Sequence, residues 1–389
     1  MKKILMYMFL LTIPAVAQIN YNVRIMDIPN SRSGIVIGIP RQQMVCLSDP
    51  GALIIMWNGQ YFYKTTDQGN SWNIFWDDTL GYQGFEHQHL CVWDDTIWNF
   101  SPNLGQDDGF VQVIDSDHLS QISIDTIDAP SGYSEPIYSG QRDGTENGMV
   151  LLAREAGEAG QYCRSNDRGR TWGEWMTMAN YVGDPRIGLV SVGDSCMALI
   201  WNQYVDVWHW NTSSSTWSLE GNRHFMDSVT QRAFSGAVWH DSIWVINNNL
   251  DVSTTYTAKR QLGFGPITSD TLWHGNPAHR ISPEYIGYNA LQIVQSLDRM
   301  VAFYVHPSDG SSGADSSKLY IRVWDSGDWS PEYLVSAGAG TANLTCPFIV
   351  PSSQGNFAYC LFKDYNGGHL AVVEIDQGGI GAPRNVRWR

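Results

Sequence analysis

The stretch Thr65-Thr66-Asp67-Gln68-Gly69-Asn70-Ser71-Trp72 occurs a second time as Ser165-Asn166-Asp167-Arg168-Gly169-Arg170-Thr171-Trp172. Both copies follow the pattern Ser/Thr-x-Asp-x-Gly-x-Ser/Thr-Trp, and each comes after an apolar, aromatic stretch, at residues 60–64 and 161–164. An Asp side chain can accept hydrogen bonds from the amides of a tight turn, and Gly can take positive φ. We therefore expect each copy to connect two antiparallel strands, with the Trp ring packed over the hairpin.

This motif resembles the Asp box, also called the BNR repeat, which occurs in the β-propellers of sialidases and of many other secreted proteins. Degenerate copies lie at Asn211–Trp217 and Trp324–Trp329. In that family the box is a folding element, usually on the rim away from the active centre. The resemblance thus predicts an architecture and not an activity. It implies structural roles for Asp67, Gly69, Trp72, Asp167, Gly169 and Trp172.

The composition is typical of a large all-β protein. The chain has 389 residues, 43% hydrophobic and only 16% charged, and its 17 Trp, 18 Tyr and 37 Gly supply a large core and many turns. Residues 1–17 combine Lys2 and Lys3 with an apolar run and Ala15-Val16-Ala17, which is the pattern of a signal peptide. No later apolar run reaches membrane-spanning length. We therefore predict an exported protein, secreted or at the cell surface, without a membrane span.

Charge and cysteine content restrict the partners. A net charge of −15 repels phosphate backbones, so we expect no nucleic-acid partner. No Cys or His spacing indicates a metal site, and we expect no cofactor. Disulfides can persist in an exported protein. We predict one between Cys346 and Cys360, which flank one expected hairpin. The six cysteines are Cys46, Cys91, Cys163, Cys196, Cys346 and Cys360.

A second pattern recurs along the chain: an apolar strand, a turn around Asp or Gly, and a further apolar strand rich in Trp and Ile. Residues 40–49 and 185–194 share it, and each is followed by a strand that ends in Trp-Asn, at Trp57 and Trp201. Spacings of about 46 to 57 residues separate successive turns, which is the length of a four-stranded propeller blade. The expected turns lie near residues 49, 95, 146, 194, 241, 298 and 354.

These seven units predict an all-β, seven-bladed β-propeller over residues 18–380. Six or eight blades are the alternatives if a weak unit between Tyr285 and Gln354 is merged or split. The seventh unit lacks a clear fourth strand, whereas residues 21–28 look like a strand without its own blade. The N-terminal strand is therefore expected to complete the seventh blade and close the ring, which removes exposed sheet edges. Residues 381–389 are either a C-terminal tail or the start of a truncated module.

Propellers usually bind ligands at the mouth of the central channel, where loops lead into the innermost strand of each blade. Three of these loops carry Arg on our alignment, and convergent guanidinium groups suit a carboxylate. Sialic or uronic acids are then the expected ligands, and the sialidase resemblance likewise implies an arginine triad. Ion pairs between blades, with Asp49, Asp184 or Asp241, are an equal alternative for these arginines. The candidate substrate-binding residues are Arg41, Arg186, Arg232 and Tyr138.

Glu86-His87-Gln88-His89 is the candidate catalytic stretch. Residues two apart in a strand face the same way, so His87 and His89 are candidates to point into the channel together. In seven-bladed lyases that act on uronic-acid polymers, Arg neutralises the carboxylate and His or Tyr removes the neighbouring proton. Two structural strand histidines are the alternative. A sialidase is a second enzyme hypothesis, although Ile39-Pro40-Arg41 differs in order from that family's motif. The candidate catalytic residues are Glu86, His87 and Tyr288.

Two classes of function follow from these patterns. The first is a secreted protein that binds or cleaves an extracellular, acidic carbohydrate at the channel mouth; as an enzyme it would be a sialidase-like glycoside hydrolase or a polysaccharide lyase. The second is a non-catalytic surface, adhesion or assembly module that associates with copies of itself. The first class predicts that Arg41, Arg186 and Arg232 surround an open pocket. The second predicts broad apolar patches on a face or on the rim.

Overall fold

A computed structural model describes most of the chain. The predicted signal peptide, residues 1–17, and the predicted tail, residues 381–389, lie outside the described residues. The structure describes the following residues: 21–29, 44–49, 51–57, 61–76, 89–103, 108–118, 120–130, 132–133, 137–142, 145–154, 160–177, 187–192, 196–201, 204–211, 213–214, 216–224, 231–240, 242–249, 255–262, 266–274, 289–307, 317–325, 327–336, 342–345, 349–350, 355–363 and 367–376.

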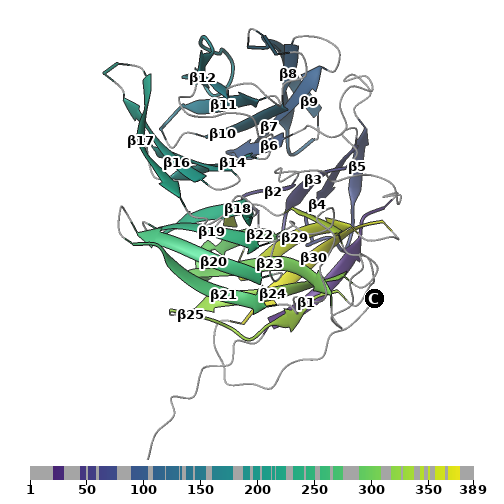
Figure 1. Ribbon diagram of the computed structural model, residues 1–389. Coiled ribbons are helices and arrows are strands. Elements are labelled where there is room, and N and C mark those ends of the chain that lie inside the picture. Colours follow the sequence, from purple (N-terminus) through teal and green to yellow (C-terminus); the bar gives the residue numbers. More distant parts are fainter. Residues whose placement is uncertain are drawn as a thin grey trace, which may run out of the picture.

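The described residues form antiparallel sheets arranged side by side (Figure 1). Sheet 1 contains β2 (Met44–Cys46), β3 (Leu53–Trp57), β4 (Tyr61–Thr65) and β5 (Asn73–Trp76). Sheet 2 contains β6 (His89–Trp93), β7 (Thr96–Asn103), β8 (Asp108–Asp115) and β9 (Ser120–Asp128). Sheet 3 contains β10 (Ile137–Arg142), β11 (Met149–Arg154), β12 (Gln161–Ser165) and β13 (Met176–Thr177).

Sheets 4 and 5 repeat this order of four consecutive strands. Sheet 4 contains β14 (Ile187–Val192), β15 (Cys196–Trp201), β16 (Tyr204–Asn211) and β17 (Thr216–His224). Sheet 5 contains β18 (Gln231–Trp239), β19 (Ser242–Asn249), β20 (Thr255–Leu262) and β21 (Thr268–His274). The one helical element within the described ranges is a 3-10 turn, η1 (Gln295–Leu297). The expectation of an all-β fold is therefore confirmed for this part of the chain.

Sheets 6 and 7 depart from the simple order. Sheet 6 contains β22 (Asn289–Val294), β23 (Arg299–Pro307), β24 (Ser317–Asp325), β25 (Asp328–Trp329) and β26 (Tyr333–Leu334), and β28 (Ile349–Val350) joins β22 in parallel. Sheet 7 contains β27 (Ala342–Thr345), β29 (Phe357–Lys363), β30 (Gly368–Ile375) and β1 (Tyr21–Asp27). The N-terminal strand β1 thus pairs antiparallel with β30, from Tyr21 opposite Ile375 to Asp27 opposite His369.

The expected turns match the strand boundaries. Those near residues 49, 95, 146, 194, 241 and 298 connect the first and second strands of sheets 1 to 6, and the one near 354 precedes β29. The two full motif copies connect the third and fourth strands of sheets 1 and 3. Both degenerate copies occupy the same place in sheets 4 and 6. The repeating turns therefore mark the strand order correctly.

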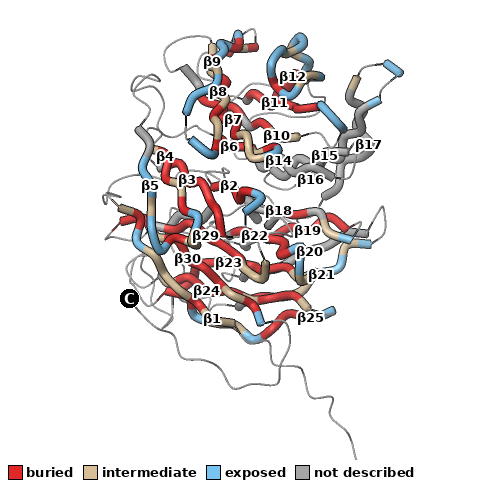
Figure 2. Tube along the Cα trace, turned by 180° about the vertical axis from the view of Figure 1, so that it is seen from behind, coloured by how far each residue is buried: buried red, intermediate tan, exposed pale blue. Residues whose placement is uncertain are grey.

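Neighbouring sheets share apolar cores, which Figure 2 shows as runs of buried strand residues. Tyr63 of sheet 1, Val301 of sheet 6 and Val373 of sheet 7 belong to one buried cluster. Phe100 of sheet 2 and Leu151 of sheet 3 belong to another. Because these clusters combine side chains of adjacent sheets, they bury apolar strand residues between one sheet and the next.

Sheets 2 and 3 approach each other closely at Gly140 in β10. A Cβ atom on Gly140 would lie 2.2 Å from the Phe100 ring of β7. The same pair of sheets has a second close approach at Gly109 of β8, where a Cβ atom would lie 2.3 Å from the ring of Tyr138 in β10. Each of these two glycines makes room for a large aromatic ring from the adjacent sheet.

The predicted Cys346–Cys360 disulfide is wrong, because Cys360 is a buried free thiol; Cys346 lies outside the described residues. Cys360 packs within the cluster shared by sheets 1, 6 and 7, where a thiol behaves as a small apolar side chain. Cys46, Cys91 and Cys163 are also buried and free. Burial raises the pKa of Cys91 to about 12, which makes this thiol unreactive.

No helix in the described ranges is long and apolar enough to cross a membrane.

Candidate functional site

The two full motif copies form the same hydrogen-bonded turn. Asp67 Oδ1 accepts the Ser71 amide at 2.9 Å and its Oδ2 accepts the Ser71 hydroxyl at 2.7 Å. The Thr65 hydroxyl donates to Asp67 Oδ1 at 2.8 Å and accepts the Gly69 amide at 2.8 Å. Gly69 has a φ of 85°, so Asp and Gly have the roles that the sequence pattern predicts. The Asp67 carboxylate faces its own turn, and its hydrogen bonds there stabilise the turn.

The second turn reproduces these contacts around Asp167. Its Oδ1 accepts the Thr171 amide at 2.9 Å, its Oδ2 accepts the Thr171 hydroxyl at 2.7 Å, and the Gly169 amide donates to Ser165 Oγ at 2.7 Å. Burial alone would raise the pKa of Asp167, but the hydrogen bonds from Thr171, Ser165 and the Arg170 amide outweigh it and lower that pKa. Asp67 has a lowered pKa for the same reasons.

Each of these turns packs on the preceding sheet. The Trp172 ring meets Phe100 of sheet 2 edge-on at 6.0 Å, and Trp72 packs against the cluster that sheet 1 shares with sheet 7. A Cβ atom on Gly69 would lie 3.2 Å from Leu370 of β30. The turns therefore connect one sheet to the next through packing contacts.

The predicted channel-mouth residues lie largely outside the described ranges. Arg232 is in β18, the first strand of sheet 5, opposite Asn248 of β19. His89 is buried at the start of β6, in agreement with a structural role. The convergence of the predicted mouth residues stays a prediction. Those outside the described ranges are Arg41, Glu86, His87, Arg186 and Tyr288.

Tyr138 is not a channel-mouth residue. Its side chain is 2% exposed and lies in the core between sheets 2 and 3, where its ring is 6.2 Å from that of Trp175. Burial raises the pKa of its hydroxyl, so the group stays protonated. The expectation that Tyr138 contacts a ligand is wrong because the position opposite it is Gly109, whose missing side chain lets the ring fill the space between sheets.

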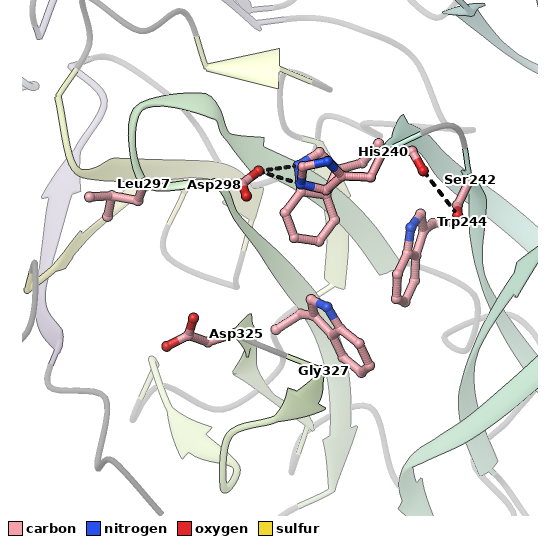
Figure 3. A pocket seen from close by; sticks show the side chains of 9 residues that line it. His240, Ser242, Trp244, Leu297, Asp298, Asp325 and Gly327 are labelled. Carbon is pink, nitrogen blue, oxygen red and sulfur yellow. Dashed lines mark hydrogen bonds and ion pairs between the residues drawn. The ribbon is translucent and has the colours of Figure 1, made fainter. Parts of the chain in front are cut away.

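The described residues instead contain an open pocket of about 420 Å³ between sheets 5 and 6 (Figure 3). We call it the Trp239 pocket. It lies where the β18–β19 turn of sheet 5 meets η1 and the β24–β25 turn of sheet 6. The residues that line it are Trp239, His240, Ser242, Trp244, Leu297, Asp298, Trp324, Asp325 and Gly327.

Asp298 organises the polar side of the pocket. Its Oδ1 accepts the Trp239 indole N–H at 2.9 Å and lies 2.5 Å from His240 Nε2. Among the described residues, no group donates to its Oδ2, the oxygen without a dashed line in Figure 3. Both Asp298 and His240 have left-handed backbones, with φ of 53° and 46°, which turns their side chains toward each other across the two sheets. One carboxylate oxygen is thus held in place, while the other accepts no hydrogen bond from the described part of the chain.

Tryptophan rings form the apolar side of the pocket. Trp244 is 2% exposed and meets Trp324 at 5.0 Å and Trp329 at 6.3 Å, both edge-on. Trp239 is only half-buried and lies 6.3 Å from Trp244. The buried rings form a rigid base, and Trp239 is the aromatic residue that reaches the open side.

A second carboxylate, Asp325, is already neutralised. Arg299 donates to Asp325 Oδ2 at 3.0 Å and to the Asp376 carbonyl oxygen at 2.9 Å. The guanidinium therefore ties sheet 6 to sheet 7 and is not free to face a ligand. No cluster of three or more metal-binding side chains occurs in the described part of the chain.

The sequence signal of the Trp239 pocket lies in the β18–β19 turn and not in the loops that carry the predicted channel-mouth residues. Val238-Trp239-His240-Asp241-Ser242-Ile243-Trp244 is a near copy of Val92-Trp93-Asp94-Asp95-Thr96-Ile97-Trp98 in sheet 2. The second copy has the same ring geometry, with Trp93 and Trp98 at 6.4 Å and 51° against 6.3 Å and 48° for Trp239 and Trp244. The copy of this turn in sheet 5 carries the half-buried Trp239 that lines the pocket, whereas Trp93 in the copy of sheet 2 is buried.

The arrangement can bind a polar ligand that also has an apolar face. Trp239 offers an indole surface, and beside it Asp298 and His240 offer hydrogen-bonding groups. Such a combination of one aromatic surface and a few oriented polar groups is typical of small-molecule sites. It suits a sugar ring, whose C–H face packs on the aromatic surface while its hydroxyls reach the polar groups.

Comparison with known proteins identifies the fold. No family model and no curated protein matches this sequence. The structure is similar to the RRP9 WD40 repeats, with a TM-score of 0.57 and 9% identity over 92% of this chain and 100% of that one. It is also similar to hydrazine synthase of Kuenenia stuttgartiensis, with a TM-score of 0.55 and 10% identity over 91% and 100% of the two chains. WD40 repeats form β-propellers, so this chain has a β-propeller fold.

Proposed function

We propose that this chain is an exported, seven-bladed β-propeller that binds carbohydrate in the Trp239 pocket. Support comes from one open depression that combines the half-buried Trp239 with Oδ2 of Asp298, an oxygen to which no described residue donates. Export is proposed from the signal-peptide pattern of residues 1–17, and Asp-box membership from the two motif copies and their matching turns.

The contacts between consecutive turns support a closed seven-bladed ring. Ser48 donates its amide to Asp95 Oδ1 at 2.7 Å, between sheets 1 and 2. Arg168 pairs with Asp94 at 3.1 Å, between sheets 3 and 2. The His240–Asp298 contact links sheets 5 and 6. The hydroxyl of Ser296 donates to the Gly355 carbonyl oxygen, between sheets 6 and 7.

The pairing of β1 supplies the last connection of the proposed ring. Met26 of β1 lies against Gly69 of sheet 1, and Arg24 donates to the Gln68 side chain of the same turn. The N-terminal strand therefore completes sheet 7 and touches sheet 1 as well. Closure of this kind leaves no sheet without a neighbour on either side.

Cleavage and acidic ligands remain separate hypotheses for the channel mouth. They depend on Arg41, Arg186, Glu86, His87 and Tyr288, which lie outside the described residues. A glycosidase or lyase reaction there would release products, whereas binding at the Trp239 pocket leaves the sugar intact. Product release from sialosides and uronic-acid polymers distinguishes the two.

The test is a glycan binding screen of the purified chain, followed by calorimetry with each ligand found. Trp239→Ala is expected to weaken binding at least about tenfold, because it removes the aromatic surface on which the sugar packs. Trp93→Ala is the matched control at the equivalent turn of sheet 2, and it should leave the affinity unchanged. Binding that survives Trp239→Ala, or no binding to any glycan, would exclude the Trp239 pocket as a carbohydrate site.

Self-association is the second candidate, and the exposed apolar residues favour it. All five large apolar side chains that are exposed in the described ranges lie on outer strands of their sheets. Ile122 is the most exposed, at 61%, and belongs to β9, an edge strand of nine residues. The predicted outcome for Ile122→Lys is a smaller particle in light scattering; an unchanged monomer for both proteins would rule this candidate out. The five residues are Ile74, Ile122, Ile124, Met176 and Leu334.

A further inference from the structure

We infer that the Trp239 pocket selects sugars by charge, in the order amino sugar, neutral sugar, acidic sugar, and that Asp298 sets this order. The inference rests on the proposed function and specifies its substrate class. It differs from the expectation for the channel mouth, where arginines were predicted to bind an acidic sugar.

The charged residues at the Trp239 pocket are acidic. None of the residues that line it is Lys or Arg. Arg299, the neighbouring cation, is 14% exposed and engaged by Asp325 and by the Asp376 carbonyl oxygen. Asp298, in contrast, is 65% exposed and its contacts are with the Trp239 indole and the His240 ring. The Asp298 carboxylate therefore lies at the open side of a pocket that has no Lys or Arg among its lining residues.

The charge of Asp298 lies next to Trp239. The indole N–H of Trp239 donates to Asp298, so the carboxylate lies beside the edge of the ring on which a sugar would pack. A substituent on that sugar would meet Oδ2, which has no donor among the described residues. An ammonium group at that position forms a charge-assisted hydrogen bond with the carboxylate, and a hydroxyl forms a weaker hydrogen bond because its donor is uncharged. A carboxylate on the sugar is repelled by the like charge of Asp298.

At the equivalent turn of sheet 2, arginines from the chain itself balance the negative charge. Its Trp93 ring is covered by two guanidinium groups, with the Arg142 carbon 4.1 Å and the Arg168 carbon 4.9 Å from the ring centroid. Arg168 also pairs with Asp94, the residue at the position of His240. The negative charge of that turn is balanced from within the chain. No Lys or Arg is among the described residues that line the Trp239 pocket, so a cationic ligand can supply the charge that the two arginines supply in sheet 2.

Calorimetry with three oligosaccharides of equal length tests the inference: N-acetylglucosamine as the neutral probe, glucosamine as the amino probe, and galacturonic acid as the acidic probe. The full chain is used, at a pH where the amine is protonated. We expect the amino probe to bind about tenfold more tightly than the neutral one, and the acidic probe more weakly than both. Asp298→Asn should make the amino and neutral probes equal. Asp94→Asn, the control at the equivalent turn, should change nothing.

The outcomes separate the inference from the proposed function. If any probe binds in a way that Trp239→Ala abolishes, the proposed function stands, and an order other than amino, neutral, acidic overturns the inference. An amino preference that persists in Asp298→Asn also overturns it. If no probe binds, or if Trp239→Ala has no effect on binding, the proposed function itself fails.

Discussion

Two turns of the molecule have nearly the same sequence and ring geometry but different surroundings. In sheet 2, Trp93 packs under Arg142 and Arg168 from sheet 3. In sheet 5, the equivalent Trp239 faces an open pocket bordered by sheet 6. The difference comes from the neighbouring sheet: β10 ends in Arg142, whereas the corresponding strand β22 ends in the buried Val294.

The second arginine is missing for a similar reason. Arg168 belongs to the full turn around Asp167, with a φ of 60° that points it back toward sheet 2. The corresponding turn of sheet 6, between β24 and β25, is shorter. Its Gly327 borders the pocket, and a Cβ atom on Gly327 would have no other atom within 4 Å. A repeat protein can thus convert one copy of a structural turn into a site by shortening the side chains of the next repeat.

The largest expected effect tests whether the two turns share one structural base. Trp98 and Trp244 are 5% and 2% exposed, so Trp98→Ala and Trp244→Ala should each lower the free energy of unfolding by about 3–5 kcal/mol. Urea unfolding followed by circular dichroism measures this. Ile74→Ser, at a 45% exposed position, is the control and should change it by less than about 0.5 kcal/mol. A large loss in one turn and a small one in the other would show that their bases differ.

The second prediction separates Trp93, which is buried, from the half-buried Trp239 at the equivalent position. Trp93→Ala should lower the free energy of unfolding by more than Trp239→Ala does, because two guanidinium groups lose their partner ring. Trp239→Ala should instead weaken glycan binding at least about tenfold. Unfolding experiments and calorimetry on both variants test whether Trp93→Ala has the larger effect on stability and Trp239→Ala the larger effect on binding. Equal effects on binding would mean that the open and covered turns are functionally alike.

The third prediction uses pH on the turn that carries Arg168. Hydrogen bonds hold the pKa of Asp167 below its ordinary value of 3.8, so its stabilisation is complete above that value and is lost as pH falls through the folded-state pKa. We expect Asp167→Asn to lower the free energy of unfolding at neutral pH by about 1 kcal/mol, a value reduced for solvent exposure. The difference from the wild type should shrink in acid.

Asp67→Asn is the matched variant for this pH experiment. Asp67 makes the same contacts in sheet 1 and also has a lowered pKa, but its turn holds no arginine over a tryptophan. The two variants should therefore agree in their pH dependence. A loss that persists unchanged below pH 3.8 would contradict the assignment to the ionised carboxylate.

The smallest effect concerns the cation that covers Trp93. Arg168→Ala removes a ring contact and an exposed ion pair with Asp94, and we expect a loss of about 0.5–1 kcal/mol. The part due to the ion pair should decrease at high salt. Thermal unfolding at low and high salt measures both parts. A stabilised variant would indicate that the arginine is held over Trp93 at a cost.

The sequence by itself determined the repeating strand order and the turn chemistry. Periodic apolar stretches predicted where six first turns lie, and the Asp and Gly of each motif predicted their own hydrogen bonds and positive φ. These features depend on residues near each other in the chain, so local physical chemistry is enough to predict them.

Only the tertiary structure decided which side chains meet across sheets. Tyr138 is buried because Gly109 of the neighbouring sheet leaves room for its ring, and Cys360, which is in no disulfide, packs within a core shared by three sheets. Sheet 6 places Val294 at the end of β22, where sheet 3 places Arg142 at the end of β10, so no arginine from that strand covers the Trp239 pocket. Each outcome depends on the side chain that an adjacent repeat supplies, and the spacing of a motif along one strand carries no information about that neighbour.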